Sequence, residues 1–349
     1  MKNIAVFIND LRVGGIQKSV TNILKNIDYT KYNIDLYMFG DNCFYEIPEK
    51  TNVIYLKKPH RVFQFLPFNI VKKIMKVDVL NKKYDVAIDF DSYQMHTALG
   101  ALKCDVLKKA IWIHNDIPIK LKEEPKYRIL HFFFKKKYRY FDTFCAVSKG
   151  AMDAFKKLEN CKGKKCYVVP NYIDTNEIKN KMNEDVDLKI NKKLLNIVTV
   201  GRLCHQKGID IMLNNISELT NYRNDFHLYI IGDGEERVNL EKQAHSLNIE
   251  KYVTFVGNQK NPFKYLKQMD LFYLSSRYEG QGMVILEAMA VGLDILIPKH
   301  LEKYCPKVKG TNDIIGYLKK YQKNGRKKFN SLQEYNENIT NELEKIFNN

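Results

Sequence analysis

The feature of this sequence that most restricts its fold is a regular alternation of short apolar runs with helix-length amphipathic segments. Helical patterns at Gly15–Asn26 and Lys149–Leu158 lie between runs of strand length, and Ser148 is placed to cap the second helix. Such alternation predicts a doubly wound parallel sheet. The strands predicted in the first half are Asn3–Ile8, Ile34–Phe39, Val53–Leu56, Val86–Phe90, Ala110–Ile113, Thr143–Val147 and Tyr167–Val169.

The alternation pauses in a polar, charged segment, Lys179–Lys193, and then begins again. We therefore predict two doubly wound domains, in residues 1–178 and 194–320, and a C-terminal helix in 321–349 whose return to the N-terminal domain is left open. Ligands of such sheets bind at the carboxyl ends of the strands, so we expect the site in the cleft between the domains. The strands predicted in the second domain are Leu195–Val200, His227–Ile231, Val253–Val256, Leu271–Ser275 and Ile295–Ile297.

The net charge of +17 is distributed unevenly along the 349 residues. Residues 1–174 hold 31 Lys and Arg against 18 Asp and Glu, a difference of +13, whereas the remainder holds 26 against 22, a difference of +4. A general bias toward lysine is one explanation. The asymmetry between the halves instead indicates an anionic partner for the N-terminal domain.

Cysteine spacing and hydropathy indicate a cytoplasmic protein. The seven cysteines are scattered and show no metal-ligand spacing, so we interpret them as reduced thiols and expect no zinc site. No apolar run reaches the roughly 18 residues of a membrane span. The N-terminal MKNIAVFIND has no small-residue cleavage site, and we interpret it as a first strand rather than a signal peptide.

The segment Leu271–Pro298 carries the strongest sign of a binding site. Its pattern is strand, loop, helix and strand, with Glu279 in the loop and Glu287 inside the apolar helix. A carboxylate in an apolar helix needs a partner, and Gly280 and Gly282 let backbone amides approach a ligand at the helix N-terminus. An anionic ligand rich in hydroxyl groups, such as a sugar nucleotide, fits this combination. The alternative is that the first carboxylate only favours the helix dipole and the second faces solvent.

A second motif, IVTVGRLCHQKGIDIML, places two cations beside another helix N-terminus. Arg202 follows a strand that ends at Gly201, and Lys207 with Gly208 opens the next helix. A guanidinium fork and an ammonium point charge at this place can hold a diphosphate without a metal. Two surface cations at a helix start are the structural alternative.

Two weaker signals lie in the N-terminal half. Gly14 and Gly15 precede the first predicted helix, but GGIQKS lacks the P-loop spacing, and such a pair is usually a tight turn. His114 follows a strand directly, a position more often occupied by a satisfied loop residue than by a catalyst.

Two basic and aromatic stretches, His60–Lys76 and Tyr127–Phe141, allow three interpretations. They can be core helices with solvated lysines, nucleic-acid binding segments, or segments that lie in a bilayer interface with lysines paired to anionic headgroups. No nucleic-acid module accompanies them, so nucleic-acid binding is the least favoured. Interface binding would suit an enzyme whose acceptor is linked to a lipid.

Together, SRYEGQGMVILEAMAVGL, GRLCHQKG and VVPNYID strongly resemble the signatures of retaining glycosyltransferases of the GT-B fold, family four type. The resemblance covers nearly the whole chain and is strongest over Ile197–Ile297. It implies two Rossmann-like domains that face each other across a cleft. The chain departs from the family pattern at Tyr172, where glycine is usual, at Asp294, where proline is usual, and in the segment 298–310.

The resemblance also implies roles for particular residues. Cations and helix amides would stabilise the charge that develops on the diphosphate, Glu279 would hold sugar hydroxyls, and Glu287 would hold the ribose. A donor phosphate oxygen would take the acceptor proton, so no protein base is assigned. The residues expected to act in catalysis are Arg202, Lys207, Glu279 and His114, and those expected to bind the donor are Gly14, Gly15, Gly257, Asn258, Gly282, Met283, Val284 and Glu287.

The expected function is retaining transfer of a hexose or N-acetylhexosamine from a nucleotide sugar, most often UDP-linked, to a hydroxyl of a glycan or glycolipid of a bacterial cell surface. The resemblance implies capsule, O-antigen or lipopolysaccharide synthesis, and no metal or other cofactor is expected. The expected location is cytoplasmic, with peripheral contact to the inner face of the membrane through residues 60–76 and 127–141. The alternatives are a nucleotide-sugar binder without turnover and a membrane or nucleic-acid binder that uses the basic half alone.

Overall fold

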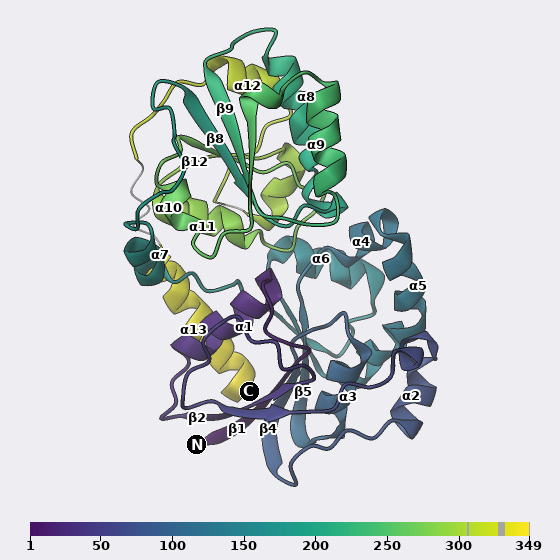
Figure 1. The fold of residues 1–349 in the computed structure, drawn as a ribbon. Helices are drawn as coiled ribbons and strands as arrows, with labels where there is room; N and C mark the ends of the chain where they lie inside the picture. Colours follow the sequence, from purple (N-terminus) through teal and green to yellow (C-terminus); the bar gives the residue numbers. More distant parts are fainter. Residues whose placement is uncertain (306, 327–331, 349) are drawn as a thin grey trace. The chain divides into compact units, whose positions relative to one another are not determined.

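The computed structural model describes residues 1–305, 307–326 and 332–348, and the chain divides into two compact units (Figure 1). Unit 1 comprises residues 1–172 and 334–349, and unit 2 comprises residues 173–333. The sequence analysis placed the domain limits at 178, 194 and 320. Part of its C-terminal segment, residues 327–331 and 349, lies outside the described residues.

Unit 1 contains a seven-stranded, entirely parallel sheet in the order β3-β2-β1-β4-β5-β6-β7. Helices cover both faces, and large buried aromatics fill the core on each side. The predicted doubly wound fold is confirmed here. The strands are β1 Lys2–Ile8, β2 Tyr32–Met38, β3 Asn52–Tyr55, β4 Lys83–Asp89, β5 Asp105–Ile113, β6 Thr143–Ala146 and β7 Lys165–Val168. The helices are α1 Gly15–Asn26, α2 Phe68–Ile74, α3 Met95–Lys103, α4 Ile117–Glu123, α5 Pro125–Phe134, α6 Lys149–Leu158 and α13 Leu332–Asn348, with 3₁₀ turns η1 Arg61–Phe65 and η2 Lys135–Tyr140.

Unit 2 repeats this architecture with a five-stranded parallel sheet in the order β10-β9-β8-β11-β12. Its strands are β8 Leu195–Val200, β9 Phe226–Ile231, β10 Val253–Gly257, β11 Leu271–Tyr273 and β12 Asp294–Leu296. Its helices are α7 Thr175–Lys181, α8 Ile209–Leu219, α9 Arg237–Ser246, α10 Phe263–Leu266, α11 Met283–Val291 and α12 Ile314–Lys320, with 3₁₀ turns η3 His205–Lys207, η4 Glu250–Tyr252 and η5 Lys299–Tyr304. No described helix in either unit is long and apolar enough to cross a membrane.

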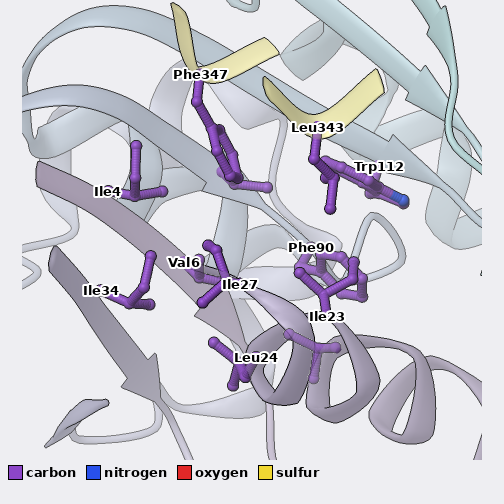
Figure 2. Close-up of a pocket in the computed structure, with 12 residues that line it drawn as sticks. Ile4, Val6, Ile23, Leu24, Ile27, Ile34, Phe90, Trp112, Leu343 and Phe347 are labelled. Atoms are coloured by element: carbon purple, nitrogen blue, oxygen red, sulfur yellow. The ribbon is translucent and has the colours of Figure 1, made fainter. Parts of the chain in front are cut away.

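Helix α13 packs onto the sheet of unit 1 beside the first helix of the chain. Its Leu343 and Phe347 line a small apolar cavity of about 20 Å³ together with residues of α1 and of β1, β2, β4 and β5 (Figure 2). Tyr172 is buried, and its hydroxyl hydrogen bonds with the Thr340 hydroxyl at 2.6 Å. The tyrosine that departs from the family glycine therefore anchors the C-terminal helix in unit 1.

The second departure, Asp294, anchors the segment that leaves unit 2. Its Oδ2 accepts hydrogen bonds from the Tyr321 hydroxyl and the Asn324 amide, each at 2.8 Å. A proline could accept no hydrogen bond through its side chain. The aspartate therefore holds the chain that follows α12 against the end of the sheet.

Candidate functional site

The two motifs of unit 2 meet because their strands are neighbours. β8 pairs in parallel with β11, so the loops that follow them, residues 201–208 and 274–282, leave the same edge of the sheet. This is the carboxyl edge, where doubly wound sheets bind ligands. Two segments about 70 residues apart in the sequence thus form one surface.

A buried carboxylate and a half-buried ammonium group form the centre of this surface. The Lys207 Nζ lies 2.7 Å from Glu279 Oε1, and the Ser276 hydroxyl donates to the same oxygen at 2.7 Å. Glu279 is 5% exposed. Its second oxygen, Oε2, receives no hydrogen bond from the part of the chain that the structure describes, and it is available to a ligand.

The loop that carries Lys207 is clamped to the loop that carries Glu279 by Arg277. The Arg277 guanidinium donates two hydrogen bonds to the Asp210 carboxylate, at 2.8 and 2.6 Å, and a third to the His205 carbonyl at 2.8 Å. Backbone contacts through Gln206 add to the clamp, since its carbonyl accepts from the Arg277 amide at 2.8 Å. A bidentate pair of this kind sets orientation as well as distance.

Gly208 is required where the two loops come closest. Its φ is +61°, and a Cβ there would lie 2.4 Å from the Ser275 carbonyl oxygen. The Ser275 hydroxyl in turn donates to the Gly208 carbonyl at 2.8 Å. Only glycine combines this backbone conformation with this contact.

The N-terminus of α11 lies in the second loop. Gly282, at φ +71°, precedes the helix and has no side chain to cap it. The first amides, from Met283 and Val284, have no partner within the helix and carry its positive dipole end. Glu287 lies one turn further along and is buried, while Gly292 ends the helix in the left-handed conformation, at φ +87°.

Arg202 and the end of β10 complete the carboxyl edge. The Arg202 side chain is exposed, and it forms no ion pair with any described residue. Gly257 adopts φ +81° at an irregularity in β10, and its carbonyl accepts from the Gly232 amide at 2.9 Å. Asn258, which follows, is exposed.

The candidates from the N-terminal half lie at the carboxyl edge of the other sheet, in unit 1. His114 directly follows β5 and is buried against the Phe90 ring, with centroids 4.9 Å apart. Its Nε2 donates to the Phe90 carbonyl at 2.6 Å, which leaves Nδ1 as an acceptor, and burial lowers the pKa of the ring to about 4. Gly14 precedes α1 in an extended conformation and Gly15 is the first residue of the helix, so the backbone does not require glycine at either position.

Comparison with known proteins identifies the C-terminal half directly. Residues 180–302 match the family described as Glycosyl transferases group 1. This part of the chain is therefore similar to the group 1 glycosyltransferases. The matched segment contains both loops described above, with Arg202, Lys207, Glu279 and Glu287.

Proteins similar to this chain align with most of its length. An N-acetylgalactosamine-N,N'-diacetylbacillosaminyl-diphospho-undecaprenol 4-alpha-N-acetylgalactosaminyltransferase of Campylobacter jejuni is 26% identical, over 86% of this chain and 81% of that protein. The uncharacterized glycosyltransferase MJ1059 of Methanocaldococcus jannaschii is 26% identical over 71% of this chain and 64% of its own length, just under two thirds.

Solved structures confirm the GT-B fold that the sequence predicts for this chain. TarM superimposes with a TM-score of 0.62 at 13% identity, over 98% of this chain and 93% of TarM. HepE of Anabaena, solved in complex with UDP, superimposes with a TM-score of 0.59 at 16% identity, over 100% of this chain and 89% of HepE. At these identities the likeness shows the fold alone.

Sequence reasoning missed several polar residues that shape the two carboxyl edges. In unit 2 these are Ser276, Arg277 and Asp210, whose pairing joins residues 67 positions apart and leaves no local pattern. In unit 1, Asp89, Asp91 and His96 are buried where β4 ends and α3 begins. The fully buried Lys137 contacts Asp89, whereas none of the three interpretations of residues 127–141 placed a buried lysine there.

Replacing Arg277 by lysine tests the clamp between the two loops. Lysine keeps the charge but cannot bridge both Asp210 oxygens and the His205 carbonyl. A displacement of a catalytic group by about 1 Å lowers the reaction rate roughly 10²-fold. We therefore expect kcat/KM for the donor to fall about 10- to 100-fold. Steady-state kinetics with Arg223→Lys as the control checks this, since Arg223 forms a similar fork with Asp225 outside the two loops. Equal effects in both variants would contradict a role for Arg277 in positioning the site.

Proposed function

We propose that this chain is a retaining transferase of a hexose or N-acetylhexosamine from a nucleotide sugar, with UDP-sugars as the first candidates. The observation that carries the proposal is the contact of Lys207 with Glu279 beside the N-terminus of α11. It brings a cation, a carboxylate with one available oxygen, and a helix dipole together at the carboxyl edge of the sheet.

The charge at this edge suits the departure of a nucleoside diphosphate. When the bond between sugar C1 and the phosphate oxygen breaks, negative charge grows on the diphosphate while the sugar becomes oxocarbenium-like. Arg202 and Lys207 supply two cations, and the amides of Gly282 and Met283 add partial positive charge. Preorganised groups of this kind stabilise the developing charge without reorganisation during the reaction. We propose that these groups act without a metal.

Glu279 is suited to hold the sugar. Lys207 and Ser276 occupy its Oε1 and fix the carboxylate plane, so Oε2 can accept hydrogen bonds from two sugar hydroxyls. We assign Glu287 to the ribose hydroxyls and the loop at Gly257 and Asn258 to the base. His114 is neutral, and its Nδ1 is available to accept a hydrogen bond from the transferred sugar.

The acceptor is proposed from the relatives. The Campylobacter jejuni protein is named for an undecaprenol-linked acceptor, a lipopolysaccharide core glycosyltransferase of Rhizobium meliloti is 34% identical over 29% of this chain, and an O-antigen glycosyltransferase of Escherichia coli is 24% identical over 60%. We propose a hydroxyl of a bacterial surface glycan or its lipid-linked precursor as the acceptor, and the cytoplasmic face of the cell membrane as the place of reaction.

A donor screen tests the proposal. Thermal shift and hydrolysis are measured with UDP-, GDP-, TDP- and ADP-sugars, with and without EDTA. We expect one donor class to raise the midpoint of thermal unfolding of the wild type but not of Glu279→Gln. The control is Lys242→Ala, which changes an exposed lysine on α9 and should respond like the wild type. Proton NMR of the first anomer released, read before mutarotation, tests retention. The absence of any shift, or identical behaviour of Glu279→Gln, would refute the donor site.

A further inference from the structure

We propose that one face of unit 1 docks this protein on an anionic lipid bilayer. The face is formed by residues 61–76 and 125–140, which contain η1, α2, α5 and η2, and we refer to it as the basic–aromatic face. The docking rests on this face alone. Only its use, to bring a lipid-linked acceptor to the enzyme, depends on the proposed function.

The two stretches form one continuous surface although about 50 residues separate them. α5 packs against η1, where the Phe65 and Phe133 rings meet edge to face at 6.4 Å. α2 packs against η2, where the Tyr140 hydroxyl donates to Asn69 at 3.1 Å and the Lys72 ammonium lies 3.8 Å from the Tyr140 ring centroid. Figure 1 shows α2 and α5 on the same side of unit 1.

Large apolar side chains point outward from this surface. The most exposed is Phe132, at 67%, and Phe65 is exposed by 51%. A cluster of exposed apolar side chains on a soluble domain marks an interaction site. The members of the cluster are Val62, Phe65, Ile70, Ile74, Ile129 and Phe132.

Basic side chains surround the apolar cluster, and residues 60–76 and 125–141 contain no aspartate or glutamate. This excess of positive charge matches a surface of anionic headgroups, and each basic residue near such a surface contributes about fivefold in affinity. The exposed basic residues of the face are Arg61, Lys73, Lys76, Lys126, Arg128, Lys135, Lys136 and Arg139.

The apolar composition favours a bilayer over a nucleic acid. Single-stranded nucleic acids stack their bases on aromatic rings. Four of the six exposed apolar side chains are isoleucine or valine, which offer no stacking surface but bury readily at the boundary between headgroups and acyl chains.

The segment η2 within this face is anchored to the core of unit 1. Lys137 is buried, and its ammonium group donates to the Ser92 and Gln94 carbonyls at 2.7 and 3.1 Å, which holds η2 in place.

Vesicle flotation tests the proposal on the full chain. Vesicles of phosphatidylcholine alone are compared with vesicles that contain 30% phosphatidylglycerol, an amount of about one lipid in three that gives a strong surface potential. We expect binding to the anionic vesicles only, weakened by salt. The triple variant Lys73→Gln, Lys135→Gln, Lys136→Gln should bind roughly 100-fold more weakly, and Phe65→Ser with Phe132→Ser at least 10-fold more weakly.

Matched controls come from unit 2, where Val238 on α9 is 60% exposed and Lys242 lies on the same helix. Val238→Ser and Lys242→Gln should bind vesicles like the wild type, and all variants should keep the wild-type melting midpoint. Equal binding to both vesicle types, or full binding by the face variants, would overturn the proposal. The proposal would also be overturned if the face variants lost binding to an oligonucleotide but kept their binding to vesicles. Donor hydrolysis without vesicles separates the two proposals, because the face variants should retain it.

Discussion

Replacing Lys207 by alanine is expected to lower kcat for sugar transfer by about 10²- to 10³-fold. The Lys207 ammonium group lies 2.7 Å from Glu279 Oε1, at the edge where the diphosphate is proposed to bind. Because the charge on the leaving diphosphate grows only as the bond to C1 breaks, most of the loss should fall on kcat rather than on KM. Steady-state kinetics with the donor identified by the screen checks this.

Two further variants decide what the Lys207 result means. Lys207→Arg keeps a cation but changes its geometry, so it should recover part of the rate. Glu279→Gln keeps the size of the side chain and an acceptor oxygen, and it should impair sugar binding as well as turnover. Lys242→Ala changes an exposed lysine on α9, outside the two loops, and should behave like the wild type. If Lys207→Ala retained the wild-type kcat, the diphosphate would have to bind elsewhere.

Replacing Lys137 by methionine is expected to lower the free energy of unfolding by about 3–5 kcal/mol. The Lys137 side chain is fully buried, and its ammonium group bonds with Asp89 Oδ2 at 3.3 Å as well as with the Ser92 and Gln94 carbonyls. Methionine fills a similar volume but leaves the buried carboxylate without a cation and two carbonyls without a donor. Urea unfolding of unit 1, followed by the fluorescence of Trp112, measures the loss.

The loss caused by Lys137→Met should depend on pH. Burial raises the pKa of Asp89 to about 6, and burial together with Asp89 raises that of Asp91 to about 7. A carboxyl group whose pKa is higher in the folded state binds extra protons there, so its contribution to stability is lost as pH rises from about 4 through 7. Without Lys137, the charged form of Asp89 has no buried cation beside it and lowers the free energy of unfolding further.

We therefore expect a larger deficit at pH 8 than at pH 5, where Asp89 can be protonated. Asp89→Asn combined with Lys137→Met should recover part of the stability at pH 8. An equal deficit at both pH values would show that lost packing, not the buried charge, explains the effect. Lys136→Met is the control, since that neighbouring side chain is exposed and should change stability little.

Local patterns in the sequence were sufficient to predict most of the fold. Helices α1 and α6 begin and end where their patterns predicted, and Ser148 caps α6 by accepting from the Ala151 amide at 3.1 Å. The strand predictions differ from the structure by a few residues at their ends. These features follow from short-range periodicity and capping, which a single sequence displays directly.

The candidate site was predictable only where a motif is contiguous. The sequence placed Lys207 and Glu279 between a predicted strand and the helix that follows it, and the parallel pairing of β8 with β11 brings them into contact. The roles of these residues, and of His114 and the glycines of unit 1, stay predictions. The clamp of Arg277 on Asp210 had no local sign, because each residue alone is an ordinary surface charge.

The sequence by itself determined the doubly wound architecture, the position of both charged loops and the likeness to group 1 glycosyltransferases, since these depend on periodicity and contiguous motifs. Only the tertiary structure decided that Tyr172 and Asp294 anchor the C-terminal segments and that one lysine of the run Lys135–Lys137 is buried while its neighbours are exposed. The physical reason is that burial and pairing depend on which elements pack together. That packing joins residues far apart in the sequence, such as Tyr172 and Thr340, which are about 170 positions apart, and it leaves no local trace.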